Sequence, residues 1–150
     1  MGRAILYTSP SDADLVFLAE NMRRQDVEEL EVSTYLPVLE ALYAAVRCSD
    51  ERFLLAAHVD GKLLCVFGCS TLGEPWLLGT DLLNGYTLSL TNAARAHCRE
   101  WLAVYPVLAN WIDVRQARVI EFLRLVGFEF FQLGEFKPGF PVQYFEMRAN

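Results

Sequence analysis

The sequence predicts an α+β fold with a mixed, mainly antiparallel sheet of six to seven strands and helices on both faces. Asp60-Gly61, between two apolar runs, is typical of an antiparallel hairpin, here spanning 53–72. A further apolar run at 75–83 adds a third strand to this hairpin. A strand–helix–strand pattern from residue 107 onward indicates a crossover. A meander followed by a crossover gives a mixed sheet, and we expect one domain over residues 1–150.

The N-terminal third is predicted to be one short strand followed by helices. Residues 3–7 form an apolar run of strand length, and Ser11 or Asp12 then offers an N-cap for a helix. A second helical region covers 26–47. We expect it to break near Pro37, because proline inside a helix removes a hydrogen bond and clashes with the preceding turn.

The second half of the chain alternates between helical and strand patterns. Gly127 stands where a helix commonly ends in a left-handed residue without a Cβ. The expected elements are a helix at 89–105, a strand at 107–114, a helix at 116–126 and strands at 128–133 and 142–147, the last two joined by a turn-rich connection.

Composition excludes several classes of protein. The chain is 53% apolar and contains 10 Phe, 6 Tyr and 3 Trp, which excludes intrinsic disorder. The net charge of −6 disfavours attraction to nucleic acid, because a polyanion is repelled. No apolar run reaches the roughly 20 residues of a membrane span, and the N-terminus lacks a signal-peptide pattern, so a cytoplasmic protein is expected.

The cysteines do not form a metal-binding pattern. None of the four stands in a Cys-x-x-Cys pair, and the chain has only 2 histidines to complete a cluster. We expect no metal, and we interpret the cysteines as small buried side chains of a reducing compartment.

The order of elements and the segment ANWIDVRQARVIEFLRLVGFEFF, at 109–131, resemble the GNAT acyltransferase superfamily. More closely, the segments 75–83, 105–128 and 141–147 are similar to a family of short phage proteins that includes the internal virion protein A of short-tailed phages. That resemblance implies a protein of the cytoplasm of an infected bacterial host or of the virion, with phage virion proteins or host proteins as partners.

The GNAT resemblance also implies where acyl-CoA would bind. In that superfamily a glycine-containing loop and a helix N-terminus hold the cofactor pyrophosphate. Here Leu88 stands at the position of the basic or amide residue, and neither glycine is present. If acyl-CoA binds, the resemblance assigns it to Leu82, Leu83, Ser89, Leu90, Thr91, Asn92 and Gln116.

No catalytic residue follows directly from the pattern. The tyrosine that protonates the leaving thiolate in the superfamily corresponds to Leu123, which cannot transfer a proton. The remaining candidates are His58, as a base on a central strand, and Glu28 and Glu29, as acids that would attract an amine. Each has a structural alternative, since a histidine often packs in a core and acids often form a solvated helix face.

Two functions remain open at this point. The first, which the lost loop and the lost acid favour, is a GNAT-fold phage protein without enzymatic activity or cofactor, acting in virion assembly or through other protein contacts. The second is an active N-acetyltransferase that uses acetyl-CoA to modify a host protein or a small amine. Self-association as a homo-oligomer is compatible with either.

Overall fold

The computed structural model describes residues 4–149, so Arg3, at the start of the first expected strand, lies outside the described residues. The chain divides into two compact units. The first contains the residues up to Thr71 together with Trp76–Gly85, and the second contains Leu72–Pro75 together with the residues from Tyr86 onward. The expectation of a single domain stays a prediction, and each unit is described by itself.

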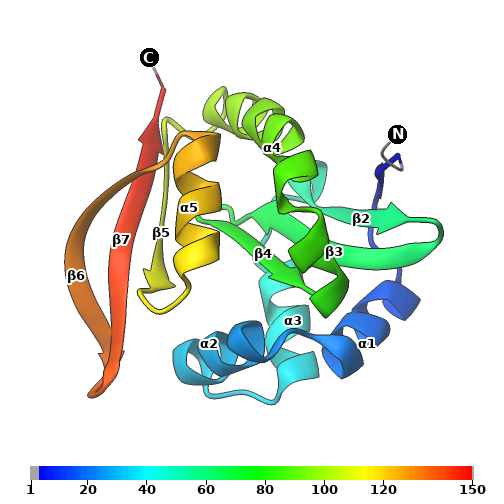
Figure 1. Ribbon diagram of the computed structural model, residues 1–150, viewed down its shortest axis with the longest axis horizontal. Coiled ribbons are helices and arrows are strands. Elements are labelled where there is room, and N and C mark those ends of the chain that lie inside the picture. Colours follow the sequence, from blue (N-terminus) through cyan, green and yellow to red (C-terminus); the bar gives the residue numbers. More distant parts are fainter. Residues whose placement is uncertain (1–3, 150) are drawn as a thin grey trace. The chain divides into compact units, whose positions relative to one another are not determined.

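The first unit combines a four-stranded sheet with three α-helices (Figure 1). Its strands are hydrogen-bonded in the order β1-β2-β3-β4, and the β1–β2 and β2–β3 pairs are antiparallel. Its elements are β1 (Leu6–Thr8), α1 (Asp12–Asn21), α2 (Arg24–Thr34), α3 (Val38–Arg47), the 3-10 turn η1 (Glu51–Phe53), β2 (Leu55–Val59), β3 (Lys62–Cys69), β4 (Pro75–Gly79) and the 3-10 turn η2 (Asp81–Gly85).

Local sequence signals account for most boundaries in this unit. Ser11 caps α1, because its hydroxyl accepts a hydrogen bond from the Asp14 N–H while the Asp14 carboxylate accepts one from the Ser11 N–H. Pro37 is the N-cap of α3, so the predicted break between two helices is confirmed. The hairpin at Asp60-Gly61 is also confirmed, and both residues have positive φ, at 52° and 75°.

The core of the first unit lies between α1, α3 and the sheet. Leu18, Leu42 and Val66 of β3 are fully buried members of one apolar cluster. The other buried members of this cluster are Leu15, Ala56, Leu63 and Leu78. Burial of this apolar stripe, more than intrinsic helix propensity, stabilises the helices in place.

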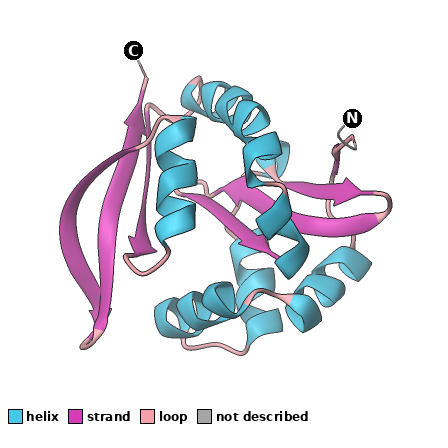
Figure 2. Ribbon diagram, viewed as in Figure 1, coloured by secondary structure: helices cyan, strands magenta, loops and turns pink. Residues whose placement is uncertain are grey.

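The second unit contains a three-stranded antiparallel sheet and two helices (Figure 2). Strand β7 pairs with both neighbours, in the order β5-β7-β6. Its elements are α4 (Thr87–Leu102), β5 (Val107–Asp113), α5 (Ala117–Val126), β6 (Glu129–Lys137) and β7 (Phe140–Arg148).

Aromatic side chains form much of the core of the second unit. The Phe145 ring lies 5.1 Å from Phe128, edge to face, and 5.6 Å from Phe130, measured between centroids. Gly127 ends α5 with φ 123°, as expected, and its N–H bonds to the carbonyl oxygen of Leu123. The α+β class is thus confirmed, with seven strands in two sheets.

Three boundaries differ from the sequence-based expectation. The strand expected to continue to residue 83 ends at Gly79, and Asp81–Gly85 forms a 3-10 turn instead. The helix expected at 89–105 runs from Thr87 to Leu102. The expected turn-rich connection at 134–141 is mostly strand, because β6 and β7 continue until only Pro138 and Gly139 separate them, Gly139 with φ 83°.

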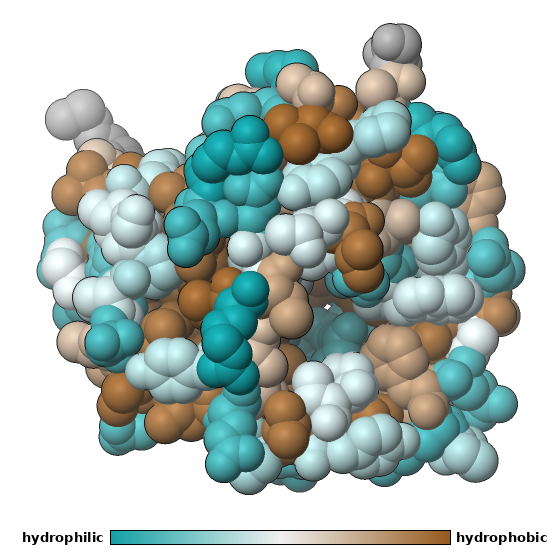
Figure 3. Space-filling model, turned by 180° about the vertical axis from the view of Figure 1, so that it is seen from behind, coloured by the Kyte–Doolittle hydropathy of each residue, from teal (hydrophilic) through white to brown (hydrophobic). Residues whose placement is uncertain are grey.

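The surface carries apolar side chains on both units. Figure 3 shows such side chains, in brown, emerging between hydrophilic ones on the face opposite to that of Figure 1. No helix within residues 4–149 is long and apolar enough to cross a membrane. The large apolar side chains exposed most strongly include Leu6, Phe17 and Tyr35 in the first unit and Leu72, Leu88 and Leu133 in the second.

Candidate functional site

The start of α4, where the sequence places the pyrophosphate site, is a helix end without a side-chain cap. Tyr86 is the N-cap residue, its side chain accepts no cap hydrogen bond, and the first turn contains no acid. The first hydrogen bond within the helix is donated by the Leu90 N–H to the Tyr86 carbonyl oxygen, at 3.1 Å. The preceding N–H groups therefore form the positive end of the helix dipole.

Four of the residues that the resemblance assigns to acyl-CoA binding lie inside α4: Ser89, Leu90, Thr91 and Asn92. Leu90 and Thr91 are buried, and the Thr91 hydroxyl donates to the Thr87 carbonyl oxygen at 3.2 Å. Ser89 and Asn92 occupy the same first two turns of the helix. The segment is therefore a continuous helix start and not a glycine-rich cradle, while its affinity for acyl-CoA stays a prediction.

Leu88 gives this helix end an apolar character. Its side chain is 79% exposed, at the position where the GNAT pattern has a basic or amide residue. A leucine there offers neither charge nor a hydrogen bond to a diphosphate. An anion at this helix end would be held by neutral donors, chiefly the main-chain N–H groups.

The expectation that Leu82 and Leu83 lie on a strand is wrong. Both belong to η2, and the Leu83 N–H donates to the Thr80 carbonyl oxygen at 3.0 Å. The turn brings the Leu83 side chain against Gly79, where an added Cβ would lie 2.5 Å from Leu83 Cδ2. The apolar run continues to Leu83 because this side chain packs onto the end of β4. The backbone of the segment is not extended.

Gln116 is the N-cap residue of α5, as the resemblance implies, but its side chain makes no cap hydrogen bond. The turn before α5 is closed by Asp113, whose carboxylate accepts hydrogen bonds from the Arg115 N–H at 2.9 Å and from its guanidinium at 2.7 Å. Burial opposes ionisation of Asp113, yet the bonds and charge of Arg115 outweigh it and hold the pKa of the carboxyl below its usual value.

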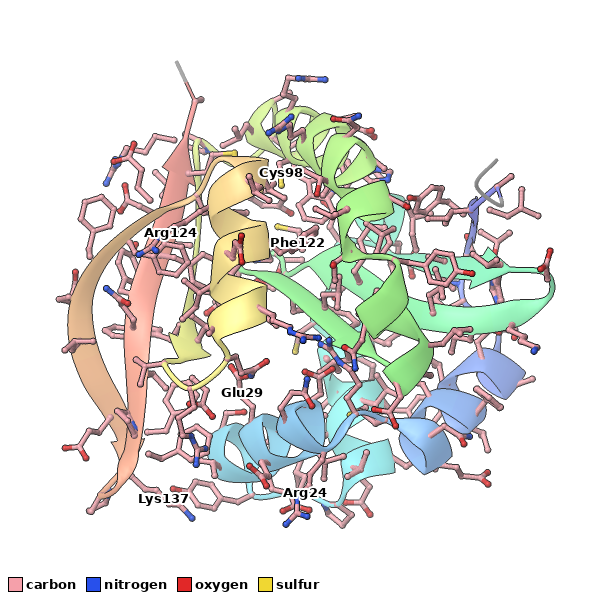
Figure 4. The ribbon with its side chains drawn as sticks, viewed as in Figure 1. Arg24, Glu29, Cys98, Phe122, Arg124 and Lys137 are labelled. Carbon is pink, nitrogen blue, oxygen red and sulfur yellow. The ribbon has the colours of Figure 1, made fainter. Side chains whose placement is uncertain are left out.

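The position expected to hold a proton donor is apolar. Leu123 lies on α5, half-buried, one turn before Gly127. Figure 4 labels Phe122 and Arg124 on either side of it and Cys98 on α4, a helix that packs against α5. Cys98 is buried, and Arg124 lies over the Phe130 ring at 5.0 Å. Cys98 and Arg124 are therefore both used in packing.

His58 has an orienting carboxylate that the sequence did not reveal. Its Nε2 lies 3.0 Å from Asp14 Oδ1, so β2 is joined to the start of α1. Burial raises the pKa of Asp14, but the bonds from Ser11 and from His58 outweigh this effect and lower it below its usual value. An Asp–His pair is an arrangement that can hold or move a proton.

Glu28 and Glu29 both lie on α2. Glu28 accepts a hydrogen bond from Arg24 Nε at 3.2 Å, one turn away on the exposed side of the helix. Figure 4 shows Glu29 and Arg24 projecting from opposite sides of α2. The two candidate acids therefore do not act as one pair, because Glu28 is engaged by an arginine of its own helix.

A buried polar cluster joins α2 to the end of β4, and sequence analysis missed it. Asp26 accepts hydrogen bonds from Arg23 Nε at 3.0 Å and from the Gly79 N–H at 2.8 Å, while Arg23 also donates to Asn84 Oδ1 at 3.0 Å. Burial raises the pKa of Asp26, against the charge of Arg23 and the bond from Gly79, which lower it. The available signal was an arginine and an aspartate three residues apart at the start of a helix.

Cys65 is a buried thiol of β3 in the first unit. Burial raises its pKa to about 12, because desolvation disfavours the thiolate more than the Arg23 charge favours it. A thiol that stays protonated is a poor nucleophile. Among residues 4–149, no group of three or more His, Cys, Asp or Glu side chains is arranged to hold a metal ion.

Comparisons with known proteins show the fold. No family model matches the sequence, and no curated protein matches it either. Among solved structures, the chain is similar to a ribosomal-protein-alanine N-acetyltransferase from Brucella melitensis, with 17% identity over 96% of this chain and 99% of that one and a TM-score of 0.66. An acetyltransferase of the GNAT family from Streptococcus pneumoniae matches with 13% identity over 98% and 100%, TM-score 0.60.

A third similar structure contains the cofactor. A Bacillus subtilis acetyltransferase in complex with CoA matches 99% of this chain and 100% of its own length, with 7% identity and a TM-score of 0.65. At these identities the likeness establishes a GNAT acetyltransferase fold for this chain. It does not transfer an activity, because one fold supports many functions.

Proposed function

We propose that this chain is a GNAT-fold protein whose acyl-CoA site is degenerate and which acts through contacts with other proteins. The strongest support is Leu123, which stands where acetyltransferases of this fold place a proton donor. The leaving thiolate of CoA needs a proton as the thioester breaks, and a leucine side chain has none to give. Leu88 adds to this support, because it leaves the start of α4 without a cation.

The helix end itself fits a diphosphate only in part. The free N–H groups at the start of α4 and the absence of acids there suit an anion. The charge-assisted hydrogen bonds that a basic residue would supply are missing, and such bonds are roughly twice as strong as neutral ones. We therefore expect affinity for CoA to be much weaker than in an active enzyme.

Titration calorimetry with CoA and acetyl-CoA tests this proposal. We expect no binding at millimolar cofactor for the natural chain. Leu88→Arg restores a cation at an exposed position, so it should increase any residual affinity, while Leu88→Glu is the matched control that repels a diphosphate. Micromolar binding by the natural chain that Leu88→Glu weakens would contradict the proposal.

The phage assignment belongs to the same proposal. It rests on the resemblance of segments 75–83, 105–128 and 141–147 to the internal virion protein A family, and it implies a role in virion assembly. We expect the gene to lie among tail and portal genes and the protein to be detected by mass spectrometry in purified particles. A chromosomal gene far from any phage genes, with no protein in particles, would contradict this assignment.

Acetyl-CoA-dependent N-acetyl transfer is the second candidate. It is supported by the open start of α4 and by the similarity of the fold to an acetyltransferase that binds CoA. The reaction would be direct attack of an amine on the thioester carbonyl, which forms the amide bond as the carbon–sulfur bond breaks. The proton lost by the amine would pass to a base such as His58 and then, through solvent, to the CoA thiolate that leaves. Release of free CoA thiol in the presence of acetyl-CoA and a lysine peptide or a polyamine would establish this function, and its absence would exclude these acceptors.

A further inference from the structure

The turn between α2 and α3 has a well-defined backbone. Its central residue, Tyr35, has φ 60° and ψ 22°, and its N–H donates to the Glu31 carbonyl oxygen at 3.0 Å. The Thr34 hydroxyl donates to the Leu30 carbonyl oxygen at 2.6 Å and accepts from the Leu36 N–H at 3.2 Å. Pro37 then begins α3. The backbone of this turn is therefore fixed by local hydrogen bonds.

Tyr35 is an unusual residue for this position. A left-handed residue after a helix is usually glycine, because a side chain with a Cβ is strained there. The Tyr35 side chain is 79% exposed, so burial of its ring within the chain does not offset this strain. Leu36, in the same turn, and Leu39, in the first turn of α3, are also among the exposed large apolar residues. Three neighbouring apolar side chains thus face solvent at a fixed turn.

Two exposed glutamates flank this apolar group in the sequence. Glu31 lies one helical turn before Tyr35 and Glu40 directly follows Leu39, and both are exposed. Residues 25–46 contain five acids and no lysine or arginine. An anionic membrane or a nucleic acid would be repelled by this charge. A basic protein surface would be attracted, and its charges would complement both glutamates.

We propose that Tyr35, Leu36 and Leu39, flanked by Glu31 and Glu40, form a docking surface for a partner protein with an apolar pocket rimmed by lysine or arginine. The term Tyr35 surface denotes these five residues. An exposed aromatic ring entering an apolar pocket is a common centre of binding energy, and the flanking charges would orient the partner. This inference rests on the proposed function in protein contacts and specifies the chemistry of the partner.

A synthetic 14-residue amphipathic helix, with leucines spaced three and four residues apart and lysines at the other positions, serves as the probe. We would titrate it into ¹⁵N-labelled protein at 150 mM salt and follow amide chemical shifts. Shifts confined to residues 31–40 are expected. Tyr35→Gly removes the ring and suits the left-handed backbone, so the variant should fold and bind at least tenfold more weakly. Glu31→Lys combined with Glu40→Lys should weaken binding to a similar extent.

Matched controls separate this surface from general acidity. Phe17→Ser removes an exposed apolar side chain of α1 in the same unit and should leave binding unchanged. A leucine–glutamate peptide of equal length should not bind, nor should vesicles of phosphatidylcholine and phosphatidylglycerol. Equal affinity of the natural chain and Tyr35→Gly, shifts centred outside 31–40, or binding to the vesicles would overturn the inference.

The outcome is independent of the calorimetry with CoA. Tight cofactor binding together with a functional Tyr35 surface would refute the degenerate site and leave the docking surface standing. Weak cofactor binding together with an inert Tyr35 surface would refute only the docking surface.

Discussion

Two of the Arg–Asp pairs within residues 4–149, Arg23–Asp26 and Arg115–Asp113, have similar spacing and opposite electrostatic behaviour. In the first unit Arg23 and Asp26 are both buried, with 4% and 5% of their side chains exposed. In the second unit Asp113 is equally buried, at 4%, but Arg115 is 55% exposed. Burial raises the pKa of Asp26, whereas the bonds from Arg115 lower that of Asp113. The distance between the charged groups is similar in the two pairs, at 3.0 and 2.7 Å. The main difference is the exposure of the arginine to water.

The difference bears on what each pair contributes. Removing both charges of Arg23 and Asp26 from water is costly, and the bonds to Gly79 and Asn84 offset part of this cost. Arg115 stays in contact with water, so the pair it forms with Asp113 costs less and contributes less. Asp113 acts mainly as the cap of the turn before α5.

The largest effect is expected at the buried pair. Asp26→Ala leaves Arg23 charged and without its carboxylate, and should lower the free energy of unfolding by about 3–5 kcal/mol. Urea denaturation followed by circular dichroism measures it. The double variant Arg23→Met, Asp26→Leu should lose clearly less than Asp26→Ala, and a loss at least as large would contradict the uncompensated charge as the cause.

A smaller loss is expected when the exposed pair loses its acid. Asp113→Ala removes the hydrogen bond from the Arg115 N–H but leaves Arg115 solvated, so we expect about 1–2 kcal/mol. The same denaturation experiment applies. A loss comparable to that of Asp26→Ala would show that the exposure of the arginine does not distinguish the two pairs.

Replacing the exposed arginine should have a still smaller effect. Arg115→Ala leaves Asp113 with its main-chain hydrogen bond and removes a guanidinium that lies 4.8 Å from the centre of the Phe140 ring. We expect a loss of about 0–1 kcal/mol, reduced further in 1 M salt. A salt-independent loss would point to the contact with Phe140 as its source.

The pH dependence should differ in sign between the two carboxylates. The pKa of Asp113 is lowered on folding, so its stabilisation is present above the unfolded value near 3.8 and is lost as pH falls through the folded pKa. The pKa of Asp26 is raised, so its contribution is present below that value and is lost as pH rises through the folded pKa.

Asn substitutions isolate these two contributions. Between pH 6 and pH 3, the stability of the natural chain relative to Asp113→Asn should decrease, and its stability relative to Asp26→Asn should increase. Chemical denaturation across this range is the measurement. If the two differences in the free energy of unfolding changed with pH in the same direction, both carboxylates would have pKa values shifted in the same direction.

Sequence patterns predicted the parts of the fold that depend on neighbouring residues. Pro37, the Asp60-Gly61 turn and Gly127 each impose a backbone conformation locally, and all three boundaries are confirmed. The prediction of a strand as far as Leu83 was wrong. A buried leucine in a turn that packs onto Gly79 gives the same apolar pattern as a leucine in a strand.

The contacts of the candidate site were beyond sequence reasoning. Asp14 meets His58 across 44 residues, and Gly79 meets Asp26 across 53. Such pairs form because the order of the strands and the packing of the helices bring the two residues together. The hydrophobic periodicity of the sequence does not indicate which distant residue each one will contact. The residue types at Leu88 and Leu123 could be read directly, because they depend only on alignment to a familiar pattern.

Gly79 lies where α2, the end of β4 and η2 meet. Its N–H donates to the buried Asp26 carboxylate, its carbonyl oxygen accepts from the Arg23 N–H, and Leu83 leaves no room for a Cβ. That proton can reach solvent only when α2, the end of β4 and η2 separate together. Its exchange with deuterium should therefore be as slow as unfolding of the whole unit permits, and its rate would report the cooperativity of that unit.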